Sequence, residues 1–182
     1  LSHNCDYSQT EVVKGMAVGV ITSQESVTQR LNVTGGQRLN GTLKVSGAKN
    51  SALVLMTASL LTSETVELVN VPDLTDIQGM GDILGALGVQ VERSDSRVSL
   101  TAEQLTNAEP PYELVNSLRA SFFSIGSLLG RMGHAKVPLP GGCRIGARPV
   151  VEHIRGLKAL GAVVSVQHGI VTASAKGTSR RL

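Results

Sequence analysis

A cysteine in a segment rich in glycine and arginine has the surroundings best suited to chemistry in this chain. Cys143 follows the pair Gly141-Gly142, and Arg144 and Arg148 stand close behind it. Glycine gives the backbone unusual freedom, and neighbouring guanidinium groups favour the reactive thiolate form of a cysteine. The segment therefore predicts a reactive thiol and a substrate with negative charge. The alternative is an inert loop cysteine, which is the commoner case for a single cysteine.

A lysine and an asparagine at a predicted helix start form a second candidate site. Lys49 and Asn50 stand just ahead of the apolar stretch 52–61. The unpaired N–H groups and the positive end of a helix favour an anion at this position, and the lysine adds a point charge. The alternative is a helix cap beside a solvated lysine, and the residues alone favour that alternative.

Two arginines and a histidine lie near two further predicted helix starts. Arg119 precedes the apolar stretch 120–129, where a surface arginine is the simpler interpretation. Arg148 precedes Pro149, which suits the first turn of a helix, and its guanidinium could bind a carboxylate or phosphate through two donors. His153 follows in the same predicted helix, where a single histidine is more often structural than catalytic.

Composition and failed motifs exclude several classes of function. The net charge is only +3, and aromatic residues make up 2% of the chain, so neither nucleic-acid stacking nor membrane-surface binding is indicated. Thr42 stands where a phosphate-binding P-loop needs lysine, and the four histidines lack metal-ligand spacing. The two cysteines suggest no disulfide framework, which fits a reducing cytoplasm.

The order of predicted elements indicates a duplicated unit. We expect strands at 43–45, 65–71, 89–92, 97–100, 163–166 and 170–173, and helices at 52–61, 76–87 and 120–129, the first of them capped by Asn50 or Ser51. Ser59-Leu60-Leu61 returns as Ser127-Leu128-Leu129, and Ala86-Leu87-Gly88 returns as Ala159-Leu160-Gly161. The second copy is five residues longer, and the extra residues fall in the loop that contains Cys143. Helices that are apolar nearly all round favour an arrangement with helices inside and sheets outside.

Three separated segments resemble the UDP-N-acetylglucosamine enolpyruvyl transferase family. They are Ala48-Lys49-Asn50, Arg119-Ala120-Ser121, and the run from Pro140 through Cys143 and Arg148 to His153, within a resemblance over 31–177. The family usually has Arg-Pro-Val-Asp-Leu-His in the third segment, so the acid of this chain, Glu152, stands one residue later. Phe123 replaces a tryptophan that relatives carry.

The resemblance implies an activity and a set of site residues. The reaction transfers the enolpyruvyl group of phosphoenolpyruvate to the 3′-hydroxyl of UDP-N-acetylglucosamine, the first committed step of cytoplasmic peptidoglycan biosynthesis, without a metal or organic cofactor. Cys143 is implied as the proton donor or covalent partner. Residues implied to bind phosphoenolpyruvate are Lys49, Asn50 and Arg148. Residues implied to bind the nucleotide sugar are Arg119, Arg148, Pro149, Val150, Val151, Glu152 and His153.

The resemblance also implies the fold and domain organisation. The expected fold is an inside-out α/β barrel of enolpyruvyl transferase type, built from repeated β-α-β-α-β-β units and incomplete in this chain. We expect 1–30 to be a disordered tail or upstream extension, 31–48 to pair with a missing second domain, and 49–182 to form about two of the three repeats of a first domain.

The sequence leaves two alternatives to the function implied by the resemblance. The chain is short for this family, so we expect an N-terminal fragment that is inactive without the C-terminal domain of the same enzyme. A non-catalytic remnant that binds a nucleotide sugar or a partner is the alternative from another class. A shikimate-pathway enolpyruvyl transferase is the alternative within the fold, although it lacks the Gly-Gly-Cys loop.

Overall fold

The computed structural model describes residues 12–13, 16–17, 19–20, 31–36, 38, 40–140 and 150–175. The chain divides into two units, Leu1–Lys44 and Val45–Leu182. In the first unit, strand β1 (Val12–Val13) pairs antiparallel with β2 (Met16–Ala17), and β3 (Gly19–Val20) pairs antiparallel with β4 (Leu31–Asn32). Most of these short strands lie within 1–30, the segment that we expected to be a disordered tail or an upstream extension. That expectation stays a prediction.

The strand predicted at 43–45 is wrong. Residues 42–48 have no regular secondary structure, and the side chains of Leu43 and Val45 are 76% and 77% exposed. An alternating sequence becomes a strand only where another strand satisfies its backbone groups. No strand within the described part of the chain pairs with this segment.

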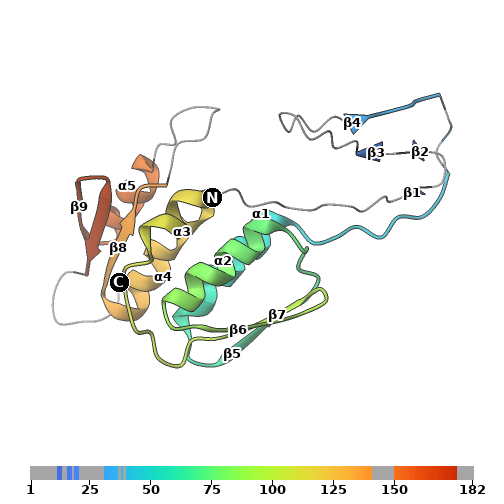
Figure 1. Cartoon of the computed structure of the whole chain (residues 1–182). Helices are drawn as coiled ribbons and strands as arrows, with labels where there is room; N and C mark the ends of the chain where they lie inside the picture. The colour runs from blue at the N-terminus through green and yellow to red at the C-terminus, as the bar shows by residue number, and fades with distance from the viewer. Residues whose placement is uncertain are drawn as a thin grey trace. The chain divides into compact units, whose positions relative to one another are not determined.

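The first repeat of the second unit combines two α-helices with a three-stranded sheet (Figure 1). Its elements are α1 (Lys49–Ala58), the 3-10 helix η1 (Ser59–Leu61), β5 (Thr65–Leu68), α2 (Thr75–Ala86), β6 (Gln90–Ser94) and β7 (Arg97–Thr101). The strand order is β5-β7-β6, and both pairings are antiparallel. The predicted helices and the 89–92 and 97–100 strands are confirmed, with ends displaced by at most three residues.

The second repeat has the same plan. Its elements are α3 (Tyr112–Ser117), the 3-10 helix η2 (Arg119–Phe123), α4 (Ser124–Met132), β8 (His134–Pro138), α5 (Val151–Ala159), β9 (Val163–Gln167) and β10 (Ile170–Ser174). The strand order β8-β10-β9 repeats that of the first sheet. The predicted helix 120–129 is divided between η2 and α4.

Matching hydrogen bonds confirm the duplication at the level of single residues. Gly88 and Gly161 follow α2 and α5 with left-handed φ angles of 100° and 95°. After each glycine, a backbone N–H reaches back to the helix, from Val89 to Leu84 and from Ala162 to Leu157, both at 3.0 Å. This is the helix-ending motif that glycine favours. The sequence predicted this repeat correctly.

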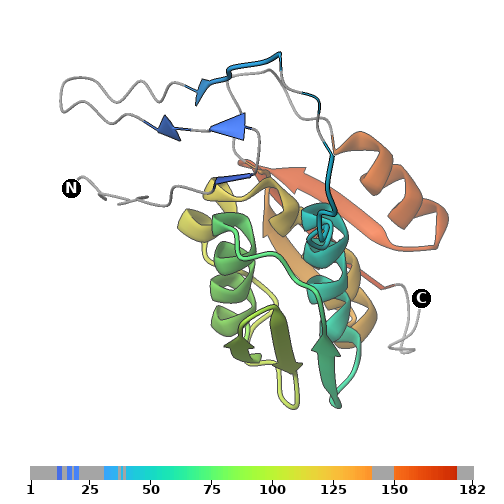
Figure 2. The same ribbon diagram turned by 90° about the vertical axis from the view of Figure 1, so that its right-hand side faces the viewer.

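Helices of both repeats contact one another, and each sheet has an exposed outer face. Helix α1 lies beside α2 and also contacts α4 and η2, as Figure 2 shows for α1 and α2. On β7, Val98 and Leu100 are buried, whereas the outward residues of β5 are exposed. The buried apolar side chains form one cluster that draws on both repeats. The content is therefore α/β, with helices central to this two-repeat array.

Candidate functional site

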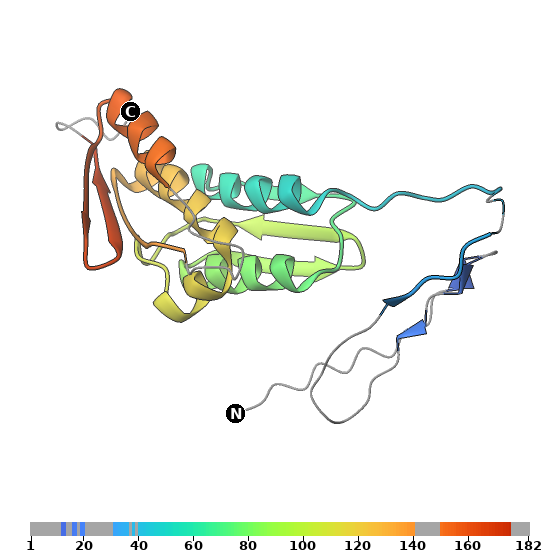
Figure 3. The same cartoon turned by 90° about the horizontal axis from the view of Figure 1, so that it is seen from above.

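Lys49 lies at the first residue of α1 and is paired with a carboxylate. Its ammonium donates to Asp76 in the first turn of α2, and the two side chains are 44% and 39% exposed. Helices α1 and α2 start at the same end of the repeat (Figure 3), because β5 returns the chain to that end between them. The neighbouring Asn50 is exposed. The predicted anion-binding pair therefore lies on an open surface at the start of two helices.

The backbone ahead of Lys49 is held by a close approach to a tight turn. A Cβ atom added at Gly47 would lie 1.8 Å from the backbone oxygen of Asn70. Asn70 itself has a left-handed φ of 57°, which asparagine tolerates better than most residues. The N–H of the next residue, Val71, donates to the oxygen of Ser96 at 2.8 Å. Glycine at position 47 thus allows the chain to enter α1 at this point.

The prediction that Asn50 or Ser51 caps α1 is wrong. The helix starts at Lys49, its N-cap residue is Ala48, and no side chain accepts from its first turn. The helix begins earlier than the apolar pattern indicated because Ala48 already provides the first helical carbonyl, which accepts from Ala52 at 3.0 Å.

Arg119 is exposed at the first residue of η2, while the serine that follows it is buried. The Ser121 hydroxyl donates to the backbone oxygen of Leu118 at 2.5 Å and is 3.3 Å from that of Val115. These bonds tie the short helix to the end of α3. The Arg-Ala-Ser segment therefore presents its arginine outward from a fixed backbone.

His153 connects the Arg119 segment with the start of α5. Its ring lies edge-on to Phe122, with centroids 5.6 Å apart, and tilted against Phe123 at 6.0 Å. Phe122 is buried and Phe123 is 41% exposed. The structure thus brings together two segments, η2 and α5, that the family resemblance implies for one nucleotide-sugar site.

The other predicted residues of α5 differ in their surroundings. Val150 packs against the hydrophobic core, whereas Val151 and Glu152 are exposed. The Glu152 carboxylate pairs with Arg155 of the same helix at 3.0 Å. Cys143, Arg148 and Pro149 lie outside the described residues, so their predicted roles stay predictions.

Two aspartates of the first repeat were not predicted as site residues. Asp76 pairs with Lys49, and Asp73 accepts from Arg93 at 2.8 Å and from Gln78 at 3.2 Å. The hydrogen bond from Gln78, then the hydrogen bond and charge of Arg93, hold the pKa of Asp73 below its ordinary value of 3.8. The position of Asp76 in the first turn of a predicted helix was the only sign of its role in the sequence. That position does not reveal Lys49, 27 positions away, as its partner.

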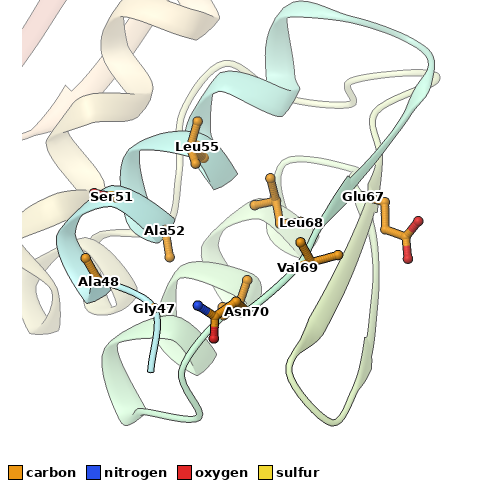
Figure 4. A pocket seen from close by; sticks show the side chains of 10 residues that line it. Gly47, Ala48, Ser51, Ala52, Leu55, Glu67, Leu68, Val69 and Asn70 are labelled. Atoms are coloured by element: carbon orange, nitrogen blue, oxygen red, sulfur yellow. The ribbon is translucent and has the colours of Figure 1, made fainter. Parts of the chain in front are cut away.

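A groove runs beside α1 but contains none of the predicted site residues (Figure 4). It has a volume of about 360 Å³ and is lined mainly by small and apolar residues of α1 and by the segment 67–71. Leu55 and Val69, which line it, are 52% and 62% exposed. Its chemistry suits packing of another apolar surface better than binding of a charged substrate.

Within the described residues, no group of three or more histidine, cysteine, aspartate or glutamate side chains could hold a metal ion. None of the helices among those residues is both long and apolar enough to cross a bilayer.

Comparison with known proteins places this arrangement in a family. Residues 33–182 match the EPSP synthase family, described as 3-phosphoshikimate 1-carboxyvinyltransferase. The UDP-N-acetylglucosamine 1-carboxyvinyltransferase of Synechococcus sp. (strain CC9605) is 74% identical over 160 residues, which are 88% of this chain and 37% of that protein. The enzyme of the same name from Parasynechococcus marenigrum (strain WH8102) is 73% identical over 167 residues, 92% of this chain and 39% of that protein.

Solved structures agree with the fold. The enolpyruvyl transferase NikO from Streptomyces tendae has a TM-score of 0.65 and 25% identity, over 78% of this chain and 31% of that chain. EPSP synthase from Acinetobacter baumannii has a TM-score of 0.53 over 75% of this chain and 32% of that chain, and its 16% identity shows the fold alone. The chain spans less than two-fifths of the length of the two relatives above. The resemblance inferred from the sequence is thereby confirmed: the chain belongs to the EPSP synthase family, and the two curated relatives above are named UDP-N-acetylglucosamine 1-carboxyvinyltransferase.

Proposed function

We propose that this chain forms part of an enzyme that transfers the enolpyruvyl group of phosphoenolpyruvate to UDP-N-acetylglucosamine in cytoplasmic peptidoglycan biosynthesis. The observation that carries the proposal is 74% identity over 160 residues to a relative of that name. The EPSP synthase family that matches the chain is named for the shikimate reaction. A relative at 74% identity is nevertheless a better guide to substrate than an EPSP synthase at 16%.

The reaction proceeds by addition followed by elimination. The 3′-hydroxyl oxygen of the sugar bonds to C2 of phosphoenolpyruvate and gives its proton to a general base, while the methylene carbon takes a proton from the Cys143 thiol. The intermediate then loses phosphate from C2 and a proton from the methyl carbon, which restores the double bond. A thiol can serve as acid here because its pKa can lie near the operating pH.

The basic residues bind the two anionic substrates in this proposal. Lys49, Asn50 and Arg148 contact phosphoenolpyruvate, and charge-assisted hydrogen bonds to its phosphate and carboxylate are the strong kind. Arg119 and the segment 148–153 contact the nucleotide sugar. The contact of His153 with Phe122 and Phe123 supports the second assignment, because it joins two of the segments concerned.

We also propose that the two repeats belong to a three-repeat inside-out barrel. In the first repeat, α2 has four buried residues and contacts α3 and η2 of the next repeat. Its counterpart α5 has no buried residue. A third repeat on α5 would cover it as the second repeat covers α2, and would reach round to the groove beside α1. The segment 31–48 would then pair with a further domain.

A chimera tests the proposed function. The residues of the Synechococcus relative that match this chain are replaced by this chain, and phosphate release is measured with both substrates. We expect the chimera to turn over and the 182-residue chain alone to be inactive, since two parts of the polypeptide must hold the substrates together. A chimera that folds but releases phosphate only with shikimate 3-phosphate as acceptor contradicts the proposal.

The thiol assignment has a separate test in the same chimera. Fosfomycin, an epoxide, alkylates an accessible thiolate, and peptide mapping locates the label. We expect Cys143 to be labelled faster than Cys5, with protection by UDP-N-acetylglucosamine and phosphoenolpyruvate together. Labelling confined to Cys5 argues against the assignment.

A non-catalytic role for the chain by itself is the second candidate, and the observation that favours it is coverage of only 37% of the relative. Calorimetric titration of the 182-residue chain with UDP-N-acetylglucosamine separates the two. Tight binding by the chain alone, joined to an inactive chimera, supports the non-catalytic role.

A further inference from the structure

We propose that Asp76 is a positioning residue that holds the Lys49 ammonium where it can bind the phosphoenolpyruvate anion. The proposal rests on the proposed function, because it concerns how Lys49 performs its role there. The observation is the ion pair between Lys49, the first residue of α1, and Asp76 in the first turn of α2.

The position of Lys49 in its helix is unfavourable unless an anion lies beside it. The first turn of a helix carries partial positive charge, which repels a lysine and attracts an acid. Neither α1 nor α2 has a side-chain cap at its start. The Asp76 carboxylate is favoured by its own helix end and also offsets the charge of Lys49. The carboxylate thus lies in the favourable first turn of α2 and offsets the unfavourable charge at the first residue of α1.

The pairing leaves the ammonium able to bind a second anion. A lysine ammonium has three N–H donors, and a bond to Asp76 uses one of them. The Lys49 side chain is 44% exposed, so a phosphate can approach the remaining donors from solvent. Asp76 lowers the number of rotamers that Lys49 samples without a substrate, and this lowers the conformational entropy lost when the anion binds.

The backbones that carry the two residues are already fixed. The approach of Gly47 to Asn70 sets the chain before α1, and buried residues of α1 and α2, including Met56 and Met80, share one core. The remaining freedom lies in the Lys49 side chain, which has a long flexible stem. A single carboxylate on a fixed helix is therefore sufficient to position it.

The test measures KM values in the chimera described above. Replacing Asp76 by asparagine (Asp76→Asn) removes the charge and keeps the size. We expect KM for phosphoenolpyruvate to rise about fivefold, as fits one exposed charge pair, while KM for UDP-N-acetylglucosamine stays unchanged. Asp76→Glu keeps the carboxylate and should recover most of the loss.

A double-mutant cycle separates positioning from a structural effect on α2. Lys49→Gln should raise KM for phosphoenolpyruvate, and adding Asp76→Asn to it should change little more. Asp73→Asn is the matched control, because it removes a carboxylate three positions away that contacts Gln78 and Arg93 instead of Lys49. It should leave both KM values unchanged.

The outcomes distinguish the two levels of the proposal. If Lys49→Gln raises KM for phosphoenolpyruvate but Asp76→Asn leaves it unchanged or lowers it, the positioning role is wrong and the proposed function stands. An equal effect of Asp76→Asn with and without Lys49 overturns the role in the same way. If the folded chimera is inactive, or Lys49→Gln has no effect, the proposed function of this site fails and the role of Asp76 fails with it.

Discussion

Contacts with other side chains distinguish two of the proposed site residues, Lys49 and His153, from ordinary surface residues. The sequence marked Lys49, Arg119 and His153, and the structure places each at or near a helix start. It could not mark Asp76 as the partner of Lys49, because 27 positions separate the pair and only the packing of α1 on α2 joins them. The same holds for the two phenylalanines beside His153. Cys143, the residue most prominent in the sequence, lies outside the described residues.

Replacing Gly47 by alanine should disturb the site through the backbone. The new Cβ would lie 1.8 Å from the oxygen of Asn70, so the chain entering α1 must move. We expect the free energy of unfolding to fall by about 2 kcal/mol and KM for phosphoenolpyruvate to rise in the chimera. Urea denaturation and initial rates measure the two effects.

The control for that substitution is Gly85→Ala in α2, where an added Cβ meets nothing within 4 Å. It should stabilise the protein by about 0.5 kcal/mol, since alanine lowers the entropy of the unfolded chain. Equal effects of the two substitutions would show that the approach to Asn70 does not constrain the fold.

The carboxylate of Asp73 should make a pH-dependent contribution to stability. Gln78 and then Arg93 lower its pKa below 3.8 in the folded protein, so the unfolded chain binds the proton more readily. The contribution is therefore complete above the unfolded pKa and is lost as the pH falls through the lower folded value. The difference in Tm between the parent and Asp73→Asn should be constant from about pH 5 to 7 and shrink below about pH 4. A constant difference down to about pH 3 would contradict this account.

At the scale of elements, local signals predicted helix ends better than strand limits. The helix predicted at 76–87 ends at Ala86, just ahead of Gly88, because the chain around the glycine decides that conformation. The 43–45 segment alternates like a strand but lacks a strand partner in the described residues. Strand 65–71 ends at Leu68, because Asn70 takes a left-handed φ that no strand tolerates. Strand pairing and turn conformation thus decide where a strand forms, even where the sequence pattern alone favours a strand.

The two equivalent glycines should respond unequally to alanine. Both have left-handed φ angles, so each substitution introduces strain. At Gly88 the Cβ would also lie 2.8 Å from the oxygen of Gln104, whereas at Gly161 it meets nothing within 4 Å. We expect losses of about 3 kcal/mol for Gly88→Ala and about 1 kcal/mol for Gly161→Ala, measured by urea denaturation. The reverse order would indicate that strain, not contact, dominates at these sites.

At the scale of the whole molecule, apolar side chains are exposed at both ends of the two-repeat array. Leu55 and Val69 lie at the α1–β5 end, and Leu160 and Val163 lie at the α5–β9 end, all more than half exposed. The sequence predicted the repeats and their central helices.

The exposed ends should make the 182-residue chain associate with itself. We expect sedimentation velocity to show concentration-dependent oligomers, and Leu55→Gln together with Leu160→Gln to reduce them without loss of stability. Tyr112→Ser, at an exposed position on α3 away from both ends, is the control and should leave association unchanged. If the chain still associates after the double substitution, the surface that mediates association lies outside these two ends.

Each three-stranded sheet pairs strands of its own repeat only, and this affects how the chain can fold during synthesis on the ribosome. The first sheet needs only residues 65–101, and the second needs only residues 134–174. No strand of either sheet must wait for a partner made much later, so loop-closure entropy stays small for each sheet. The first repeat can complete its sheet while the second is still being translated. The apolar faces of α1 and α2 are then available for α3, η2 and α4 to pack against as these helices leave the ribosome.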